Sequence, residues 1–122
     1  MYARAVRTYQ KVQLESASPA KLLDELYERL LRDVAEADEA IRGRNAALKG
    51  ERVAHALAIV GELRAALDHR PAPELTAQLD ALYEFMTARL TRANVHWDQV
   101  ALAEVPPLVV TLRDAFRGAA RS

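Results

Sequence analysis

Three histidines, His55, His69 and His96, are the side chains of this chain best suited to metal binding or proton transfer. A helical bundle can hold a di-iron centre when a glutamate precedes a histidine by three residues on an inward helix face. None of the three has Glu or Asp at that spacing. The chain also has no cysteine, which excludes disulfides, thiolate metal sites and thiol catalysis. We therefore expect no metal and no cofactor.

Other catalytic patterns are missing from the sequence as well. The four glycines are scattered singly, so there is no glycine-rich phosphate loop. The Gly-x-Ser-x-Gly pattern of serine hydrolases does not occur. Carboxylates such as Asp24 and Glu28 fall mostly on the solvated side of a predicted helix. We expect no catalytic residues and predict that the protein is not an enzyme.

One segment keeps a chemical alternative open. Ala54-His55-Ala56-Leu57 is similar to the start of the motif in histidine phosphotransfer domains, which are also four-helix bundles. Those domains continue with a lysine and a glycine, where this chain has Ala58 and Ile59. A phosphoryl group on His55 would meet a branched apolar side chain and no fixed cation. We favour an ordinary histidine on a helix and retain phosphotransfer as the alternative function.

Apolar residues recur at alternating steps of three and four, which is typical of amphipathic helices. Residues 79–98 show this best, because six apolar side chains share one face there and polar residues occupy the other. Similar stripes cover residues 19–42, 53–67 and 99–117, and the helix that carries the second stripe could start anywhere from Asn45 to Glu51. The stripe of residues 79–98 consists of Leu79, Tyr83, Met86, Leu90, Ala93 and Trp97.

Capping residues and prolines place the helix boundaries. Ser18-Pro19 predicts a helix start, and Asn45 and Asp98 are N-cap candidates. Gly43 predicts a left-handed C-cap. Residues 68–73 contain two prolines and predict a break between helices.

These elements predict an all-α, antiparallel up-down-up-down four-helix bundle of residues 18–122. No stretch alternates strictly as a half-buried strand would. Pro106-Pro107 interrupts the last stripe, so we expect a kink or a break there. Residues 1–17 form a separate N-terminal arm, expected to include a short helical segment.

Composition limits the partners. Seventeen basic and seventeen acidic residues give zero net charge, which argues against nucleic-acid binding. The first ten residues lack the apolar core of a signal peptide, and no apolar run is long enough to span a membrane. We expect a cytoplasmic protein without membrane insertion.

The N-terminal arm and the width of the stripes suggest an interaction role. Val6, Tyr9 and Gln13 could share one face of a short helix, although pattern alone favours a frayed terminus. The apolar stripes supply more surface than four packed helices need. Such an excess is typical of a groove that receives another helix.

Taken in order, the segments resemble the FliS family, flagellar export chaperones that bind flagellin in the bacterial cytoplasm. The likeness covers almost the whole chain, and the ordered set is more specific than any one piece. The matching pieces are Tyr9-x-x-x-Gln13, Ala17-Ser18-Pro19-x-Lys21-Leu22 with Leu26-Tyr27, Leu63-x-x-x-Leu67-Asp68, Leu82-Tyr83-x-x-Met86-x-x-Arg89-Leu90-x-x-Ala93-Asn94, and Glu104-Val105 with Leu112-Arg113-Asp114-Ala115.

The resemblance implies a non-enzymatic chaperone that holds the C-terminal helical segment of flagellin in hydrophobic grooves. The partner stays unpolymerised and competent for secretion, and the arm covers part of the groove when flagellin is absent. Export-gate components are possible further partners, and a homodimer remains open. The resemblance implies these partner-binding residues: Tyr9, Gln13, Ser18, Pro19, Tyr27, Leu63, Leu67, Asp68, Tyr83, Leu90 and Asn94.

The chain departs from the family pattern at three places. Phe116 stands where the family usually has tryptophan, and Gln78 lies near a usual asparagine. Pro106-Pro107 interrupts a helix that is normally continuous. These departures bear on the shape of the last helix and on any part of the partner site built on it.

Overall fold

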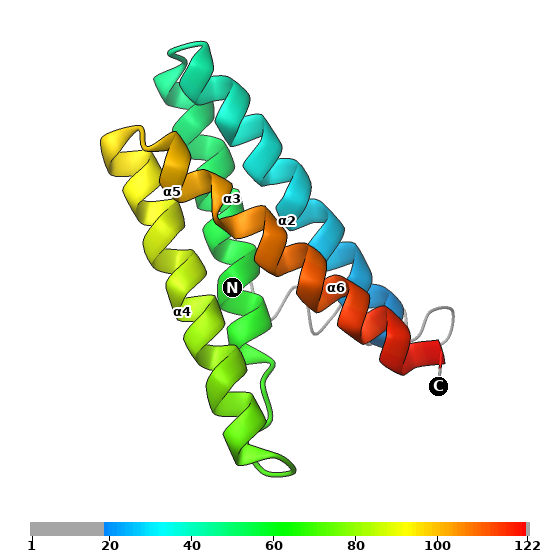
Figure 1. Cartoon of the computed structure of the whole chain (residues 1–122). Helices are drawn as coiled ribbons and strands as arrows, with labels where there is room; N and C mark the ends of the chain where they lie inside the picture. Colours follow the sequence, from blue (N-terminus) through cyan, green and yellow to red (C-terminus); the bar gives the residue numbers. More distant parts are fainter. Residues whose placement is uncertain (1–18, 122) are drawn as a thin grey trace.

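The computed structural model describes residues 19–121, which form the helices labelled α2 to α6 in Figure 1. α2, α3 and α4 alternate in direction, and α5 with α6 makes the fourth, returning arm. Within these residues there is no strand, and no helix is long and apolar enough to cross a membrane. The predicted all-α antiparallel bundle is confirmed. The helices are α2 Pro19–Arg42, α3 Ala46–Ala65, α4 Pro73–His96, α5 Gln99–Ala103 and α6 Val105–Arg121.

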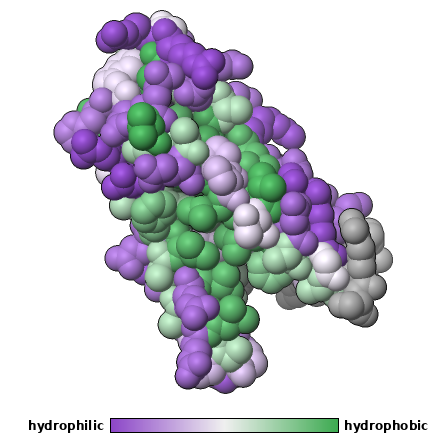
Figure 2. Space-filling model, in the orientation of Figure 1, coloured by the Kyte–Doolittle hydropathy of each residue, from purple (hydrophilic) through white to green (hydrophobic). Residues whose placement is uncertain are grey.

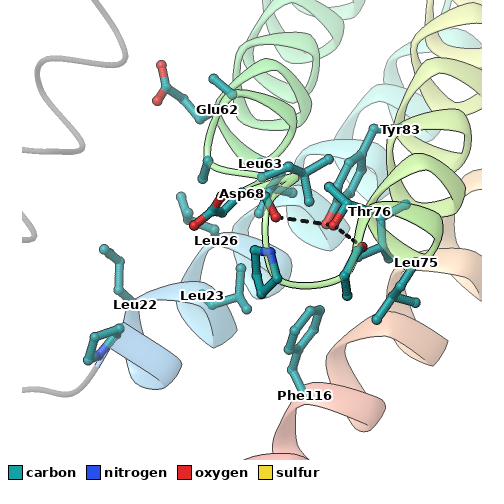
Figure 3. Close-up of a pocket in the computed structure, with 17 residues that line it drawn as sticks. Leu22, Leu23, Leu26, Glu62, Leu63, Asp68, Leu75, Thr76, Tyr83 and Phe116 are labelled. Atoms are coloured by element: carbon teal, nitrogen blue, oxygen red, sulfur yellow. Dashed lines mark hydrogen bonds between the residues drawn. The ribbon is translucent and has the colours of Figure 1, made fainter.

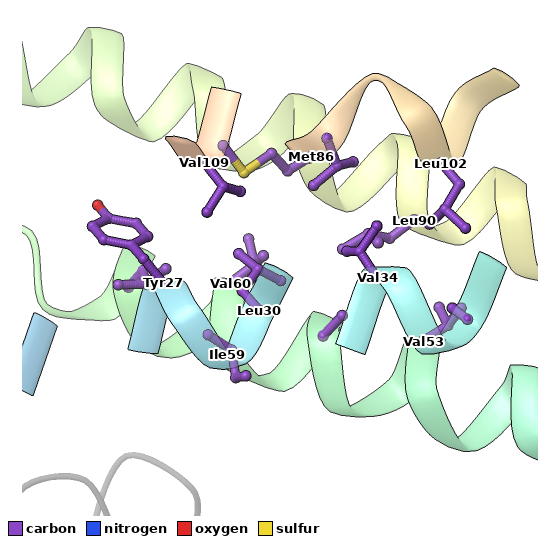
Figure 4. Packing of buried hydrophobic residues seen from close by; sticks show 14 of the residues in the cluster. Tyr27, Leu30, Val34, Val53, Ile59, Val60, Met86, Leu90, Leu102 and Val109 are labelled. Atoms are coloured by element: carbon purple, nitrogen blue, oxygen red, sulfur yellow. The ribbon is translucent and has the colours of Figure 1, made fainter. Parts of the chain in front are cut away.

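One hydrophobic core joins all four arms of the bundle (Figure 4). Leu30 from α2 and Val60 from α3 face Met86 from α4, and all three are fully buried. Val109 closes the core from α6. The predicted stripe of α4 is buried from Tyr83 to Ala93, because that face packs on its neighbours.

The predicted N-caps are present. The Asn45 side chain accepts a hydrogen bond of 3.1 Å from the backbone N–H of Leu48. The Asp98 side chain accepts one of 3.0 Å from the N–H of Ala101. Each bond satisfies one of the amide groups that the first turn of a helix leaves without a partner. Helix α2 begins at Pro19.

The prediction for Gly43 is wrong in one respect. The left-handed residue after α2 is Arg44, with φ 56°, whereas Gly43 has no positive φ. The N–H of Asn45 then reaches back to the carbonyl of Ala40 at 2.8 Å. Gly43 still continues the helical hydrogen bonding, through its N–H to Glu39 at 2.9 Å. The helix therefore reverses one residue later than the glycine indicated.

The predicted break at the proline pair is also present, and it lies just before the prolines. α5 ends at Ala103 and α6 begins at Val105, so Pro106 and Pro107 occupy the first turn of α6. Proline is tolerated there because the amide groups of a first turn have no partner within the helix. The break lets α6 leave α5 in a new direction, and in Figure 1 it crosses toward the start of α2.

Candidate partner-binding groove

An apolar groove opens where α4 and α6 diverge. α6 packs chiefly on α2 and touches α4 only sparsely. Figure 2 shows apolar residues gathered on this face, whereas polar residues predominate toward α5. The hollow has a volume of about 660 Å³. Its walls are the start of α2, the end of α3, the following turn, the start of α4 and one side chain of α6: Pro19, Leu22, Leu23, Leu26, Glu62, Leu63, Ala65, Ala66, Leu67, Asp68, Pro71, Ala72, Leu75, Thr76, Leu79, Tyr83 and Phe116.

Ion pairs hold α6 against α2 on one side of the groove. The Arg117 guanidinium binds both carboxylate oxygens of Asp24 and reaches Glu28 at 2.8 Å. Arg113 binds the same Glu28 oxygen at 2.8 Å. The hydrogen bond from Arg117 lowers the pKa of Asp24, so this carboxylate is charged at neutral pH. The network keeps the last turns of α6 beside the first turns of α2.

A second ion pair holds α4 against α3 on the other side. Arg64 binds the two carboxylate oxygens of Asp80 at 2.6 and 3.0 Å, a bidentate geometry that fixes orientation. The only ion pair found within residues 19–121 between α4 and the α5–α6 junction joins Arg89 to Glu104 at 3.9 Å. Ion pairs thus join α6 to α2 and α4 to α3. The distance between α4 and α6 therefore increases from their α5 ends toward the start of α4 and the end of α6.

Two tyrosines meet at the floor of the groove, where Tyr83 lines the hollow and Tyr27 lies beneath it. The hydroxyl oxygens of Tyr27 and Tyr83 lie 2.6 Å apart, and both side chains are buried. Burial raises the pKa of both hydroxyls, so both stay protonated at physiological pH. The Phe116 ring stacks on Tyr27 with a centroid distance of 6.1 Å. In Figure 3, Tyr83 reaches in from α4 and Phe116 from α6.

The turn between α3 and α4 closes one end of the groove. The buried Thr76 hydroxyl lies 2.8 Å from the carbonyl of Ala72 and 3.2 Å from that of Asp68 (Figure 3). The Asp68 carboxylate accepts hydrogen bonds from the backbone N–H and the guanidinium of Arg70. These bonds lower the pKa of Asp68 and keep it charged at the rim.

The structure brings together six of the residues that the sequence resemblance assigned to partner binding. Tyr27 lies beneath the groove against Tyr83. Tyr9, Gln13 and Ser18 lie outside the described residues. The five residues that line the groove are Pro19, Leu63, Leu67, Asp68 and Tyr83.

Two other predicted residues lie away from the groove. Leu90 is fully buried in the core, two helical turns beyond Tyr83 along α4. Asn94 lies near the far end of α4, where its carbonyl accepts a hydrogen bond from the Lys49 ammonium. Their roles in partner binding remain predictions, and the groove itself does not include them.

Several groove residues were not on the predicted list. Leu75 is 56% exposed and Phe116 is 37% exposed, and both line the hollow. Leu22, Leu23 and Leu79 add apolar wall. Leu75 precedes the predicted stripe of residues 79–98, whereas Phe116 falls within the predicted stripe of residues 99–117. A signal in the sequence was the position of Phe116, where the family usually has tryptophan.

A second apolar hollow of about 660 Å³ lies between the later half of α2 and the α5–α6 junction. Leu31 and Val34 form one wall, and Pro106 and Pro107 form the other. Val100 is the most exposed large apolar residue at its edge. Pro106 and Pro107 therefore form part of an apolar surface, in addition to following the break between α5 and α6.

The surroundings of His55 do not support phosphotransfer. Its Nδ1 lies 3.3 Å from a carboxylate oxygen of the buried Asp33. Arg52, the nearby cation, is paired with Asp33 at 3.7 Å and with Glu36 at 3.0 Å. A phosphoryl group at His55 would face a carboxylate, and its counter-charge would already be engaged. Ile59, at the place of the required glycine, is a core residue.

Comparison with known proteins identifies the family of the chain. The family model described as "Flagellar protein FliS" matches residues 2–122. The chain is 37% identical to flagellar secretion chaperone FliSB of Pseudomonas aeruginosa, over 97% of this chain and 98% of that protein. It is 34% identical to FliS of Bacillus subtilis, over 93% and 84%, and 32% identical to FliS of Escherichia coli, over 96% and 90%. The chain therefore belongs to the FliS family of flagellar secretion chaperones, a family of chaperones and not of enzymes.

Proposed function

We propose that this export chaperone binds the C-terminal helical segment of flagellin in the groove between α4 and α6. Binding takes place in the cytoplasm, and it keeps flagellin from polymerising before secretion. The observation that carries the proposal is the apolar groove itself, floored by Tyr83 and edged by the exposed Leu75 and Phe116. An apolar surface of this kind, rimmed by charged residues, is typical of an interaction site.

The chemistry of the groove suits a helical peptide. A segment that is disordered when free loses conformational entropy on binding, and buried apolar contact must offset that loss. Leucine side chains from α2, α3 and α4 supply such contact. Ion pairs fix the flanking helices, so the groove needs little rearrangement to receive a helix.

The first prediction concerns Leu75. Leu75→Ser should weaken binding of a cognate flagellin C-terminal peptide about fivefold to tenfold, because its apolar surface would no longer be buried against the partner. Titration calorimetry measures the affinity. Val95→Ser is the matched control, since Val95 is 63% exposed on the same helix and does not line the groove. The control should stay within about twofold of the parent protein.

Two results would contradict the proposal. One is no binding of the cognate peptide at micromolar concentration. The other is an equal loss of affinity in both variants, which would place the partner elsewhere on the bundle. Pull-down of full-length flagellin, but not of C-terminally truncated flagellin, is the expected result in the complementary experiment.

The second prediction concerns the N-terminal arm, which we propose covers part of the groove when flagellin is absent, as the family resemblance implies. Tyr9→Ala should raise peptide affinity, because the arm would compete less well with the partner. The thermal midpoint should change little. Calorimetry and thermal unfolding of the same sample measure both. Unchanged affinity with a clear loss of stability would make Tyr9 an ordinary packing residue.

Contacts with export-gate components and self-association are separate proposals for the same protein. The second hollow, beside Pro106 and Pro107, offers further apolar surface for a partner that wraps around the bundle. Sedimentation of the protein alone at several concentrations distinguishes a homodimer from a monomer.

A further inference from the structure

The tyrosine pair on the groove floor has more hydrogen-bond donors than partners. Two hydroxyl groups carry two protons, but a single hydrogen bond of 2.6 Å joins Tyr27 to Tyr83. No other side chain or backbone group among residues 19–121 is hydrogen-bonded to either hydroxyl. One proton of the pair therefore has no acceptor in the part of the chain that the structure describes. An unpaired donor in a buried site is costly, so a partner for this proton is favoured.

The free proton belongs to Tyr83. Tyr83 lines the groove, whereas Tyr27 is fully buried behind it, under the ring of Phe116. If Tyr83 donated to Tyr27, the remaining proton would lie inside the core with no acceptor. If Tyr27 donates to Tyr83, the remaining proton faces the groove, where water or an occupant can accept it. When Tyr27 donates to Tyr83, each of the two hydroxyl protons therefore has an acceptor available.

We propose that Tyr83 is a specificity-determining residue that donates a hydrogen bond to an uncharged polar side chain on the apolar face of the bound helix. This inference rests on the proposed function of the groove and adds the chemistry of its occupant. The recognised residue is an asparagine, glutamine, serine or threonine, flanked by apolar residues that meet the leucines of the wall.

The acceptor must be a side chain because the bound segment of the partner is a helix. In a helix the backbone carbonyls are already engaged in internal hydrogen bonds. A carboxylate would lose its hydration in a groove lined mainly by apolar residues, with no cation among the groove residues. A neutral amide or hydroxyl oxygen meets the proton at a smaller desolvation cost.

Two matched variants test the inference, since each removes one hydroxyl and keeps its ring. Tyr83→Phe removes the donor and should weaken binding of the cognate flagellin C-terminal peptide about threefold to tenfold. Tyr27→Phe leaves the Tyr83 hydroxyl in the groove and should stay within about twofold of the parent protein. Both variants lose the same internal hydrogen bond, so each should lower the thermal midpoint by at least about 4 °C. Tyr83→Phe should be the less stable of the two, because it also leaves the buried Tyr27 hydroxyl without an acceptor among the described residues.

A peptide series identifies the acceptor on the partner. Each Asn, Gln, Ser and Thr of the peptide is replaced in turn by alanine, and affinity is measured for the parent protein and for Tyr83→Phe. One replacement should weaken binding to the parent protein several-fold and leave binding to Tyr83→Phe unchanged. That pattern assigns the hydrogen bond to one pair of residues.

The outcomes separate this inference from the proposed function. Peptide binding to the parent protein, with equal affinities for Tyr83→Phe and Tyr27→Phe, would overturn the inference and leave the groove assignment standing. The same holds if every peptide replacement acts equally on both proteins. Absence of any peptide binding to the parent protein would instead remove the proposed function.

Discussion

Leu90→Ala is expected to lower the free energy of unfolding by about 3 to 4 kcal/mol. Leu90 is 0% exposed and packs in the cluster formed by α2, α3, α4 and the start of α6. Truncation removes buried methyl groups and leaves a cavity that the surrounding helices fill only in part. Urea unfolding followed by circular dichroism measures the change.

The same variant separates a core role from a partner role. The folded fraction of Leu90→Ala should bind the flagellin C-terminal peptide as the parent protein does, because Leu90 does not line the groove. Leu75→Ala is the matched control for stability, since Leu75 is mostly exposed on the same helix and should cost no more than about 0.5 kcal/mol. A tenfold loss of affinity with less than about 1 kcal/mol lost in stability would make Leu90 a partner residue.

The helices and their starts were predictable because they depend on neighbours in sequence. A stripe at steps of three and four requires only that one face be buried, and residues 79–98 met that condition. Asn45 and Asp98 cap their helices through bonds that span three residues. The proline pair predicted the break after α5, because proline has no backbone N–H to donate within a helix and its ring clashes with the preceding turn.

Arg44 shows where a local rule was insufficient. Glycine is the usual left-handed residue after a helix, so Gly43 predicted the reversal. The left-handed residue is instead Arg44, in a turn whose flanking residues Ile41 and Lys49 are both buried. Intrinsic preference is a weak guide at such a position, because tertiary context often overrides it.

The groove was only partly predictable, for a different reason. A helical stripe gives the face that is apolar but not the neighbour that covers it. Tyr83 and Leu90 share one stripe, yet Tyr83 borders the groove and Leu90 is enclosed. The difference depends on the path of α6, which is held to α2 by Arg117 and Asp24, 93 residues apart in sequence. The family resemblance could name Tyr83 but could not show where α4 separates from α6.

Lys49 is a buried charged residue that no sequence pattern indicated. It is 7% exposed, on the first turn of α3. Its ammonium donates a hydrogen bond to the carbonyl of Asn94, near the end of α4, and lies 4.0 Å from the centroid of the Trp97 ring. The negative end of the helix dipole and the face of the aromatic ring both favour a cation there. Lys49 therefore links the start of α3 to the turn between α4 and α5.

Lys49→Met should lower the free energy of unfolding by about 2 kcal/mol, because it removes a charge-assisted hydrogen bond and a cation–π contact while keeping most of the side-chain volume. Relief of the desolvation cost of the ammonium offsets part of this loss. Denaturant unfolding measures the change, and the fluorescence of Trp97 reports the altered contact directly, since Trp97 is the only tryptophan.

The control is Arg32→Met, at an exposed cationic residue of α2, which should stay within about 0.5 kcal/mol of the parent protein. A Lys49→Met protein as stable as the parent would mean that desolvation of the ammonium cancels its contacts. Peptide binding should be unchanged, because Lys49 does not line the groove. A loss of stability with unchanged peptide binding would show that the contacts of Lys49 at the α5 end stabilise the fold. Partner binding would then depend on the opposite end of the bundle, where α4 and α6 diverge.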